Sequence, residues 1–520
     1  MKFLVQYGSP CMRFFCCVVV GFLTLLPVSS TVAQIAISPL FTASETYTDN
    51  VNLGLASGIG GGVGGGFGLG GGFGGVGAKS SDLITQLNPG VKITGTGKRY
   101  DLNTQYIMNN LIFARNSNLT RIRHLLNADG NAEIIKDLFF IEGNARIAQQ
   151  NIGLLGAQTD NNIFVTGNRA TLQVYSVSPF LRHQFGDFAS TELRYSKSIV
   201  KSGVFGFRDS QRDGVQFGLN SGESFTRVGW GLNYSNQRIH LSGINREIEL
   251  ERSIANLQYI LTRRFILTAS GGYERNSFIS IRGRTSLPTW TAGFIWNPNQ
   301  RTNIQFNAGQ RFFGDTYYGE INYSRRLMNL RVLYAEDITT FNQQAGVFGA
   351  FGALDNSFFT GMGLQNLLSL NNFLTNRVFL QRRFNASISL NGSRNDIELS
   401  LFGISRIPYS SEELDEDLIG VANLFLFNNT KQMGGNLNWN YKLSSRADLR
   451  TTFSFLRFDF AGASGTNDNL IFSTSLNRNF ESNLRGSLEY RYINRLSSVQ
   501  SFSGFGRSAN AVTVSLTKNF

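Results

Sequence analysis

One stretch of the sequence reads Thr226-Arg227-Val228-Gly229-Trp230-Gly231-Leu232-Asn233-Tyr234, with residue types that alternate one by one. One set holds Thr, Val, Trp, Leu and Tyr, and the set between them holds Arg, two Gly and Asn. Successive side chains of a β-strand point to opposite faces, so a strand with this pattern has one apolar and one polar face. A strand that separates lipid from water requires that pattern.

The same period of two recurs along the chain. Further examples are Thr302–Phe312, where Gln310 interrupts the apolar set, the segment with Leu437, Trp439, Tyr441 and Leu443, and the segment with Leu484, Leu488, Tyr490 and Tyr492. A single such segment could be a half-buried strand of a soluble sandwich. More than a dozen of them, separated by tight turns, indicate a membrane barrel instead.

Ten short polar turns separate the alternating segments: Gly95-Thr96-Gly97, Ile135-Lys136-Asp137, Phe185-Gly186-Asp187, Ser221-Gly222-Glu223, Thr262-Arg263-Arg264, Asn297-Pro298-Asn299, Ser324-Arg325-Arg326, Ser393-Arg394-Asn395, Ser444-Ser445-Arg446 and Glu481-Ser482-Asn483. Longer connections lie between them, for example at 151–167, 200–213, 237–248, 340–373, 407–431 and 497–508. Short periplasmic turns and long extracellular loops are typical of outer-membrane barrels. Ten hairpins with one more strand at each end predict an all-β, transmembrane antiparallel β-barrel of about 22 strands, within a range of 16–22.

Two features fit this barrel less well. Pro179 falls inside the strand expected at Thr171–His183, where a closed sheet has no edge to tolerate a missing N–H donor. We therefore expect a bulge at Pro179. Residues 413–427 do not alternate cleanly, and we interpret them as part of a loop.

Aromatic residues lie beside some of the turns. Trp296 adjoins the Asn297 turn, and Trp439 and Tyr441 precede the Ser444 turn. Such positions suit the girdle of aromatic rings at a membrane interface. The alternative is aromatic packing in a soluble sheet.

The last residues support the barrel independently. Val512, Val514 and Leu516 alternate with polar residues, and the chain ends on Phe520. This ending resembles the C-terminal signal that the barrel-assembly machinery recognises in outer-membrane proteins. Lys518 departs from that signal, in which an apolar or aromatic residue is usual at this place. We expect the machinery to be a partner of this chain.

Composition excludes several other classes of protein. Only 16% of the 520 residues are charged, against about 25% in soluble domains. At about 150 residues a domain, the length would predict three or four soluble domains, but no Pro-bearing linkers divide the chain. After residue 33, no apolar run approaches the roughly 18–20 residues of a membrane-spanning helix, which excludes a helical membrane protein.

The N-terminus is typical of a secretory signal peptide. Lys2 and Arg13 supply a positive region, Phe14–Leu26 is a short apolar run, and small residues end at Ala33. The alternative, a membrane anchor, would need a longer apolar run, and the residues before Cys16 and Cys17 are not the small ones that lipid attachment requires. Cleavage of 1–33 would remove every cysteine and lower the net charge from +13 to +11, leaving 34–520 as the mature barrel.

Two connections have biased compositions. Residues 54–78 are mostly Gly and, by topology, form the first extracellular loop. Gly70–Gly75 loosely match a phosphate-binding loop, but no strand-to-helix context and no Lys-Ser/Thr follow, so a flexible loop is the better interpretation. Residues 340–373 are a long loop rich in Phe and Gly. This loop could enter the lumen as a constriction, lie over the rim or be disordered, and we slightly favour contact with the rim or lumen.

The sequence shows no pattern of catalysis or of cofactor binding. His124, His183 and His240 are far apart and lack acidic or hydroxyl partners at any motif spacing. The acidic residues at 412–417 lack the spacing of an EF-hand, so we interpret them as a solvated loop with no metal. The arginines are spread over turns and inner faces and do not cluster with aromatics, which argues against nucleic acid. We expect no enzyme activity, no catalytic residue, no metal and no cofactor.

The inward faces of the strands hold the candidate site residues. They are rich in Arg, Asn and Gln, which suit hydroxyl-rich or weakly anionic solutes, although any barrel needs a polar interior. We expect the following residues to line the lumen: Glu192, Arg194, Arg227, Asn303, Gln305, Asn307, Arg311, Asn436, Asn438, Asn440, Arg450, Arg485, Glu489 and Arg491. Residues 34–80 are too few and too Gly-rich to form a plug domain. The lumen is therefore open, occluded by loops or narrower than about 22 strands imply.

Three sequence segments carry a family resemblance. They are Glu45–Val51, Lys79–Thr85 with Asn88-Pro89-Gly90, and Ser178–Arg182. They resemble the outer-membrane barrels associated with the PEP-CTERM/exosortase sorting system of exopolysaccharide-producing Gram-negative bacteria. The resemblance implies an outer-membrane location and a link to exopolysaccharide production or export. It carries over no catalytic residue.

The sequence thus predicts a non-enzymatic, porin-like barrel involved in exopolysaccharide export or surface association. Its expected partners are outer-membrane lipid, the barrel-assembly machinery, and polysaccharide with its export machinery. The alternative is a structural or adhesive surface protein that acts through its extracellular loops. An outer-membrane hydrolase is a distant third, because no His with Ser or Asp partners can be assembled from the sequence.

Overall fold

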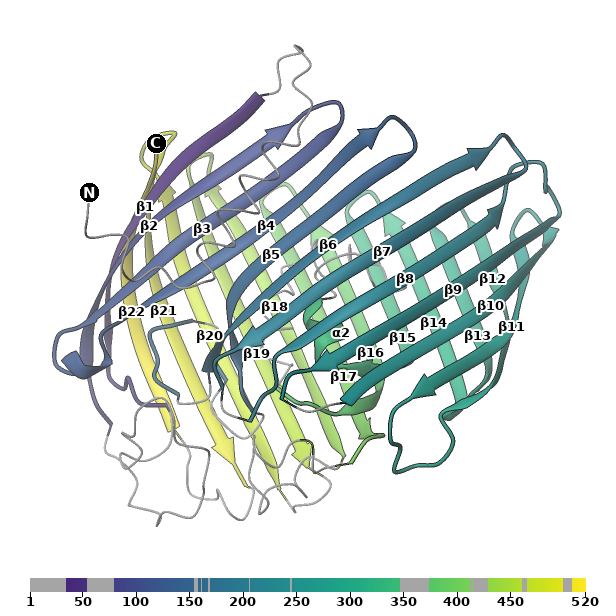
Figure 1. The fold of residues 1–520 in the computed structure, drawn as a ribbon. Helices are drawn as coiled ribbons and strands as arrows, with labels where there is room; N and C mark the ends of the chain where they lie inside the picture. Colours follow the sequence, from purple (N-terminus) through teal and green to yellow (C-terminus); the bar gives the residue numbers. More distant parts are fainter. Residues whose placement is uncertain are drawn as a thin grey trace, which may run out of the picture.

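The computed structural model describes residues 34–53, 79–153, 158–159, 161–166, 169–204, 206–243, 246–346, 374–411, 414, 429–460, 465–498 and 507–520. These residues form one sheet of 22 strands. Each strand pairs with its neighbours in the chain, and the first strand pairs with the last, so the sheet closes on itself (Figure 1). The all-β antiparallel barrel of about 22 strands that the sequence predicts is confirmed.

The first half of the wall consists of β1 (Gln34–Thr48), β2 (Asp82–Thr96), β3 (Tyr100–Phe113), β4 (Arg121–Ile135), β5 (Phe139–Asn151), β6 (Arg169–Phe185), β7 (Ala189–Ser202), β8 (Ser210–Ser221), β9 (Val228–Leu241), β10 (Arg246–Thr262) and β11 (Phe265–Ser277). The second half consists of β12 (Ser286–Asn299), β13 (Thr302–Arg311), β14 (Gly314–Arg325), β15 (Met328–Thr340), β16 (Val378–Asn391), β17 (Asn395–Pro408), β18 (Thr430–Ser444), β19 (Ala447–Phe460), β20 (Thr466–Asn479), β21 (Leu484–Ser497) and β22 (Arg507–Asn519). The described connections also contain the 3-10 turn η1 (Ser117–Leu119) and the short helix α2 (Phe341–Gly346).

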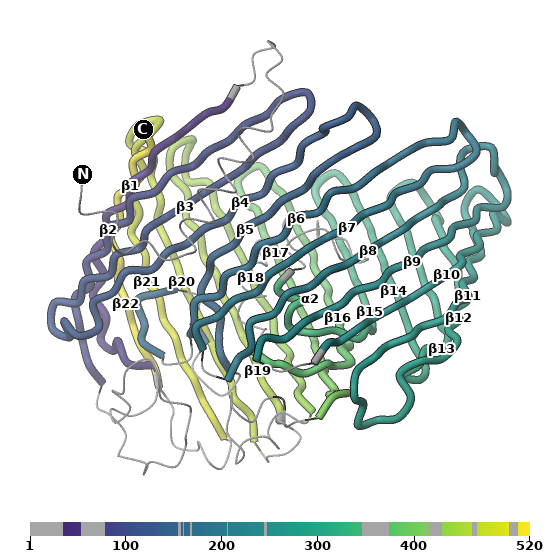
Figure 2. Tube along the Cα trace, viewed as in Figure 1, coloured from purple at the N-terminus to yellow at the C-terminus, as the bar shows by residue number. Residues whose placement is uncertain are grey.

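The two ends of the barrel differ in their connections, as the chain trace in Figure 2 shows. All ten short turns expected from the sequence join consecutive strands at one end, which we call the turn end. The opposite, loop end carries the longer connections. Two connections there are not long: residues 242–245 join β9 to β10, within the long connection expected at 237–248, and only Phe312 and Phe313 join β13 to β14. The expected rule of long loops at this end is therefore wrong for these two hairpins.

The β13–β14 hairpin lies beside a gap in the ladder of hydrogen bonds between β14 and β15. β14 begins at Gly314, but its pairing with β15 begins only at Tyr318, opposite Ala335. β15 continues to Thr340, and over this extension it pairs with β16 alone. β14 and β15 therefore separate towards the loop end.

The outer face of the wall is apolar. Leu232, Leu257 and Phe306 expose 47%, 50% and 42% of their surface, although each lies within a regular strand. Large apolar side chains in such number would be unfavourable in water, but they are expected against lipid. Trp296 and Trp439 lie on this face near the turns, as a girdle requires. Among the described helical residues, no segment is long and apolar enough to cross a membrane.

Polar side chains and the chain end reinforce the closure of β1 on β22. The hydroxyl of Thr42 lies 3.0 Å from that of Thr517, and Thr46 and Thr513 repeat the contact at 2.9 Å. The N–H of Phe520 donates to the carbonyl of Pro39 at 2.9 Å. On the other face, Val512, Val514 and Leu516 are exposed as the expected apolar row of the last strand. Their recognition by the assembly machinery stays a prediction.

Pro179 lies inside β6 without a bulge. Its partner on β5 is Ile141, and the register with β7 is the same on both sides of it, from Val177 opposite Lys197 to Phe180 opposite Arg194. Only the two intervening pairs with β7 are missing. The expected bulge is therefore wrong, because the wall loses local hydrogen bonds to one neighbour without a shift in register. Pro89 of β2 interrupts the pairing with β3 in the same way.

Several sequence expectations fall wholly or mostly outside the described residues. They are the signal peptide at 1–33, the Gly-rich loop at 54–78, residues 347–373 of the Phe/Gly-rich loop, the acidic residues at 412–417, and residues 413–427 apart from Leu414.

Three glycines of the inner face lie where neighbouring strands approach closely. A Cβ atom built on Gly272, Gly293 or Gly309 would lie 2.0, 1.9 or 2.0 Å from a backbone carbonyl oxygen of the adjacent strand. No larger residue fits at that distance. These glycines let β11 approach β10 and let β12 and β13 approach each other.

We expect Gly272→Val to lower the free energy of unfolding by about 1–3 kcal/mol, because the added side chain forces β10 and β11 apart. Gly271→Val is the matched control, since a Cβ on this adjacent residue meets nothing within 4 Å. The free energy of unfolding of both variants is measured from the fraction of barrel that stays folded in unheated detergent gels over a urea series. Equal losses for the two variants would contradict the close approach.

Candidate functional site

The inner wall of the barrel is polar where the outer wall is apolar. On β13, Phe306 faces outward, and its neighbours Gln305 and Asn307 face the lumen. The same alternation places most of the other predicted lumen residues on the inner face: Glu192 and Arg194 of β7, Asn303 and Arg311 of β13, Asn436, Asn438 and Asn440 of β18, Arg450 of β19, and Arg485, Glu489 and Arg491 of β21. Their part in transport stays a proposal.

The structure distributes these residues over separate arcs of the wall. Asn440 lies opposite Arg450 in the β18–β19 ladder, and Arg491 donates to Glu489 at 2.9 Å on β21. The β7 and β13 residues lie on other parts of the circumference, so the predicted set forms no single site. Arg227 differs from the others because it lies, exposed, in the turn before β9.

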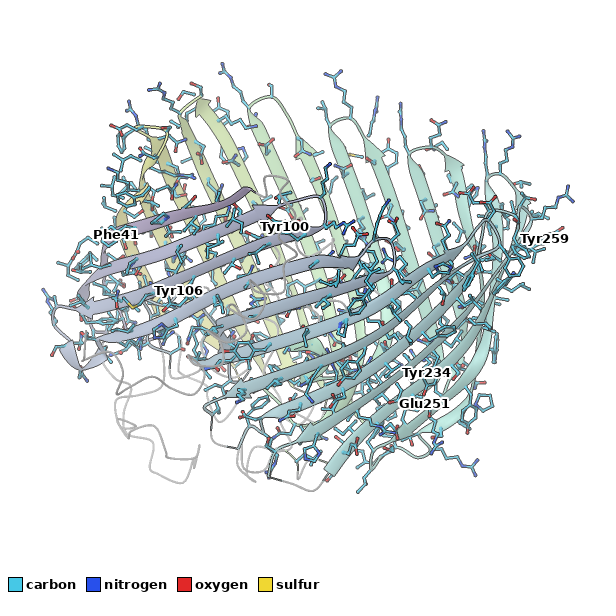
Figure 3. The ribbon with its side chains drawn as sticks, turned by 45° about the horizontal axis from the view of Figure 1, so that its top comes forward. Phe41, Tyr100, Tyr106, Tyr234, Glu251 and Tyr259 are labelled. Atoms are coloured by element: carbon cyan, nitrogen blue, oxygen red, sulfur yellow. The ribbon has the colours of Figure 1, made fainter. Side chains whose placement is uncertain are left out.

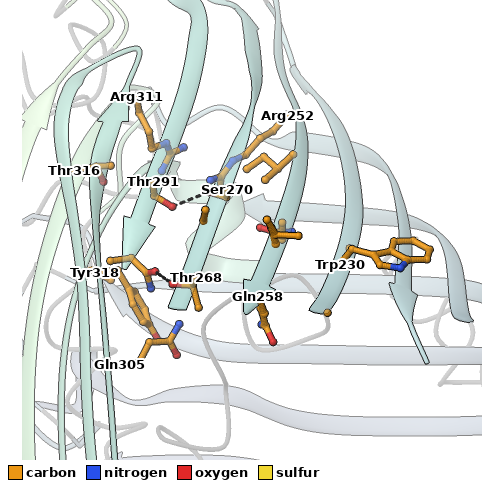
Figure 4. A pocket seen from close by; sticks show the side chains of 18 of the residues that line it. Trp230, Arg252, Gln258, Thr268, Ser270, Thr291, Gln305, Arg311, Thr316 and Tyr318 are labelled. Atoms are coloured by element: carbon orange, nitrogen blue, oxygen red, sulfur yellow. Dashed lines mark hydrogen bonds between the residues drawn. The ribbon is translucent and has the colours of Figure 1, made fainter. Parts of the chain in front are cut away.

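A cavity of about 670 Å³ lies against the inner face of β8–β15. Figure 4 shows its wall, from which hydroxyl, amide and guanidinium groups project. Thr268 donates to Asn307 at 2.7 Å, and the hydroxyls of Ser270 and Thr291 lie 2.6 Å apart. Gln258, Gln305 and Tyr318 add further polar groups to the lining. The cavity thus offers many hydrogen-bond donors and acceptors.

An ion-pair network holds the loop-end side of this cavity. Arg311 donates to both oxygens of Glu274, at 2.6 and 3.2 Å, and to Asp337 at 3.0 Å. Arg252 contacts Glu274 at 3.3 Å. Arg311 and Glu274 expose only 8% and 2% of their side chains, whereas Asp337 exposes 56%. Arg311 therefore ties β11, β13 and β15 together past the short end of β14.

A second network lies on the inner face of β5–β7. Arg194 contacts Glu142 at 2.5 Å and Glu192 at 3.0 Å, and Glu192 also accepts from Arg182 at 2.8 Å. The guanidinium of Arg194 lies 3.9 Å from the centre of the Phe180 ring. This alternation of charges fixes Glu192 and Arg194 in the wall, so they are already engaged with protein partners.

The described loops at the loop end contact one another and the ends of nearby strands. The N–H of Val165, from the β5–β6 loop, donates to Val51 of the β1–β2 loop at 2.9 Å. Asn162 of the same loop accepts from Arg121 and Arg123 of β4 at 3.1 and 3.0 Å. Val51 and Phe164 are fully or almost fully buried. We call residues 158–159, 161–166, 341–346 and 374–377 the loop cap.

Helix α2 forms the second part of the loop cap. It follows β15 and reaches the wall of β7–β9, and Figure 1 shows it within the outline of the barrel. Asn342 donates to Ser210 of β8 at 2.7 Å, and Gln343 donates to Gln237 of β9 at 2.9 Å. Phe341 packs with Val200 and other apolar residues of β6 and β7. The favoured contact of 340–373 with the rim or lumen is confirmed for the described residues 340–346.

The chain after the undescribed part of that loop completes the cap. Leu374 donates its N–H to Ile152 at 3.1 Å, and Asn376 contacts the β7–β8 loop at Gly206 and Arg208, at 2.9 and 3.0 Å. An apolar cluster beside it contains the following residues from four strands and two connections: Ile239, Leu241, Ile248, Phe312, Ile338, Val378, Leu380 and Tyr409. The described loops thus restrict the loop end while the turn end carries only short turns.

Sequence reasoning missed the residues that connect distant strands. Arg252, Glu274 and Asp337 share the cavity edge with Arg311, yet they come from β10, β11 and β15. The period of two could have placed Arg252 and Glu274 on inner faces, because each is an odd number of residues from an outward apolar or aromatic residue of its strand, Leu257 and Tyr273. No local signal could have paired them. The contacts of the loop cap likewise join residues that are far apart in the sequence.

Comparisons with known proteins assign no family. No model of a known protein family matches the sequence, and no curated protein matches it. Among solved structures, the siderophore receptor PirA of Pseudomonas aeruginosa has a TM-score of 0.44 at 9% identity, over 94% of this chain and 81% of its own. OpdQ of the same organism has a TM-score of 0.34 at 7% identity, over 94% and 97%. PirA of Acinetobacter baumannii has a TM-score of 0.45 at 9% identity, over 92% and 80%. Likenesses this distant carry neither family nor function to this chain.

The barrel's own features decide its location. Its closed sheet leaves no strand edge facing lipid along most of the wall, and its outer face exposes large apolar side chains. The protein is an outer-membrane β-barrel, and its outer face contacts membrane lipid.

Glu274→Ala should lower the free energy of unfolding by about 3–5 kcal/mol, because Arg311 would remain buried without its main partner. Asp337→Ala is the control, since an ion pair with so exposed a carboxylate contributes only about 0–1 kcal/mol. Urea unfolding of the detergent-solubilised barrel, followed by tryptophan fluorescence, measures both changes. A smaller effect for Glu274→Ala than for the control would show that the network is not the anchor described.

Proposed function

We propose that the protein is a non-enzymatic, porin-like barrel through which hydroxyl-rich polymers, and extracellular polysaccharide in particular, cross or associate with the outer membrane. The cavity against β8–β15 carries this proposal, because amide, hydroxyl and guanidinium groups line it. Such groups both donate and accept hydrogen bonds, as a chain of sugar hydroxyls requires. The resemblance of the sequence to barrels of exopolysaccharide-producing bacteria supports the same class of molecule.

The positions of the histidines favour passage over catalysis. His124 contacts Tyr106 on the outer face of β3–β4, and His183 and His240 also alternate with inward residues of their strands. A general base must reach the substrate. None of these three residues faces the polar cavity, so a hydrolytic site in the lumen would have to work without histidine.

The loop cap makes passage conditional. Asn342 and Gln343 connect α2 to the opposite wall through side-chain hydrogen bonds, each worth about 0.5–1.5 kcal/mol. Contacts of this size are weak enough to open and close during transport. The proposed function therefore includes a closed state with these contacts formed and an open state in which the loop cap moves aside.

The double variant Asn342→Ala/Gln343→Ala should raise the single-channel conductance in planar bilayers, because α2 loses its contacts with β8 and β9. Neutral oligosaccharide added to the bath should then reduce the current by occupying the lumen. Asn483→Ala is the matched control, since this exposed amide lies in the β20–β21 turn, away from the loop cap.

A barrel that forms no pore in any of these variants would contradict the transport proposal. The surface-protein alternative would then be tested by deletion of residues 54–77 and 340–373. Loss of cell–cell or cell–matrix adhesion with intact barrel assembly would support that alternative.

A further inference from the structure

The positive charge of the turn end is concentrated on one side of the barrel. Five consecutive turns, from β10–β11 to β18–β19, carry arginine and no acidic residue. We call their arginines the arginine arc, which consists of Arg263, Arg264, Arg301, Arg325, Arg326, Arg394 and Arg446. Long side chains project from this end of the wall in Figure 3.

The other five turns have no such excess. Their basic residues are Lys98, Arg99, Lys136 and Arg227, and their acidic residues are Asp137, Asp187, Glu223 and Glu481. Positive and negative charges are therefore equal in number there. The excess on the arginine arc is a property of one side of the mouth and does not follow from the general basicity of the chain.

The side chains of the arginine arc are exposed and have no ion-pair partner among the described residues, which include all ten turns. The two acidic residues nearest to the arc in the strands are already engaged. Asp396 contacts Lys442 at 3.0 Å, and Asp448 contacts Arg485 at 3.4 Å. The guanidinium groups of the arc are thus available to a molecule that approaches from outside the barrel.

The arginine arc and the polar cavity share part of the wall. The turns of β10–β11, β12–β13 and β14–β15 belong to strands whose inner faces line the cavity. A molecule that enters the barrel along this side passes the arc first. Arg252 and Arg311 on the same strands are held by Glu274 and Asp337, whereas the arginine arc has no such partners in the part of the chain that the structure describes.

We propose that the turn-end mouth recognises anionic groups, and that the molecule handled by this barrel is an acidic saccharide polymer bearing carboxylates. This inference rests on the proposed function and names the charge class of its substrate. Arginine forms paired hydrogen bonds with carboxylates, and rings of Arg or Lys select anions in pores. At physiological salt, where charges are screened over about 8 Å, several arginines along the arc can bind successive charges of one polymer.

The first test measures binding without any need for conductance. Detergent-solubilised barrel is titrated with fluorescently labelled polygalacturonate, and with neutral dextran of the same length. We expect the acidic polymer to bind about tenfold more tightly at low salt, with the difference shrinking as salt rises. Arg264→Gln/Arg325→Gln/Arg326→Gln should remove most of the difference, and the matched control Lys98→Gln/Arg99→Gln/Lys136→Gln should keep it.

The second test measures ion selectivity in planar bilayers under a salt gradient, in the Asn342→Ala/Gln343→Ala background. We expect anion preference, reduced by the three arginine substitutions and kept by the control. Equal binding of both polymers, or equal effects of the two triple variants, would overturn the inference even if the barrel conducts. Binding of the acidic polymer by a barrel that does not conduct would retain the inference and refute the transport proposal.

Anionic phospholipid of the inner leaflet is the competing occupant of the arginine arc. Nanodiscs with and without phosphatidylglycerol separate the two. If the arginine substitutions weaken retention of phosphatidylglycerol around the barrel while binding of polygalacturonate is unchanged, the arc contacts lipid and the inference is wrong.

Discussion

The structure depends on the requirement that backbone N–H and C=O groups within a membrane find partners inside the protein. Antiparallel pairing satisfies them between neighbouring strands, and the pairing of β1 with β22 removes the last open edge. Closure also explains the rest of the wall. Once each strand has two neighbours, its side chains can only point to lipid or to the lumen. Each position of a strand therefore needs a residue type that suits one of these two environments.

This constraint has a counterpart inside the barrel. Over much of the inner wall, ion pairs and amide contacts take the place of an apolar core, as the network around Arg311 and Glu274 shows. Buried charges of this kind are costly when one partner is missing, so they fix the position of strands more than they stabilise them. The loop cap is different, because it combines apolar packing around Phe341 with single hydrogen bonds that can break independently.

Much of the wall was predictable because its signal is local. The alternation in Thr226–Tyr234 and the ten turns gave the strand number and the inward faces of β13 and β18. The failures have physical reasons. Pro179 needs no bulge because a barrel strand can lose pairs to one neighbour while the other holds its register. The Arg311 network and the loop cap depend on contacts between residues distant in the chain, which periodicity cannot express.

The divergence of β14 from β15 has a consequence for local opening of the barrel wall. Beyond Tyr318 and Ala335, the facing edges of these strands lack a ladder, and β4 and β5 leave a similar gap beyond Leu126 and Ile147. Backbone amides there have fewer bonds to break before they exchange with solvent deuterium. The wall therefore opens more easily at these two gaps than where both neighbours hold a strand.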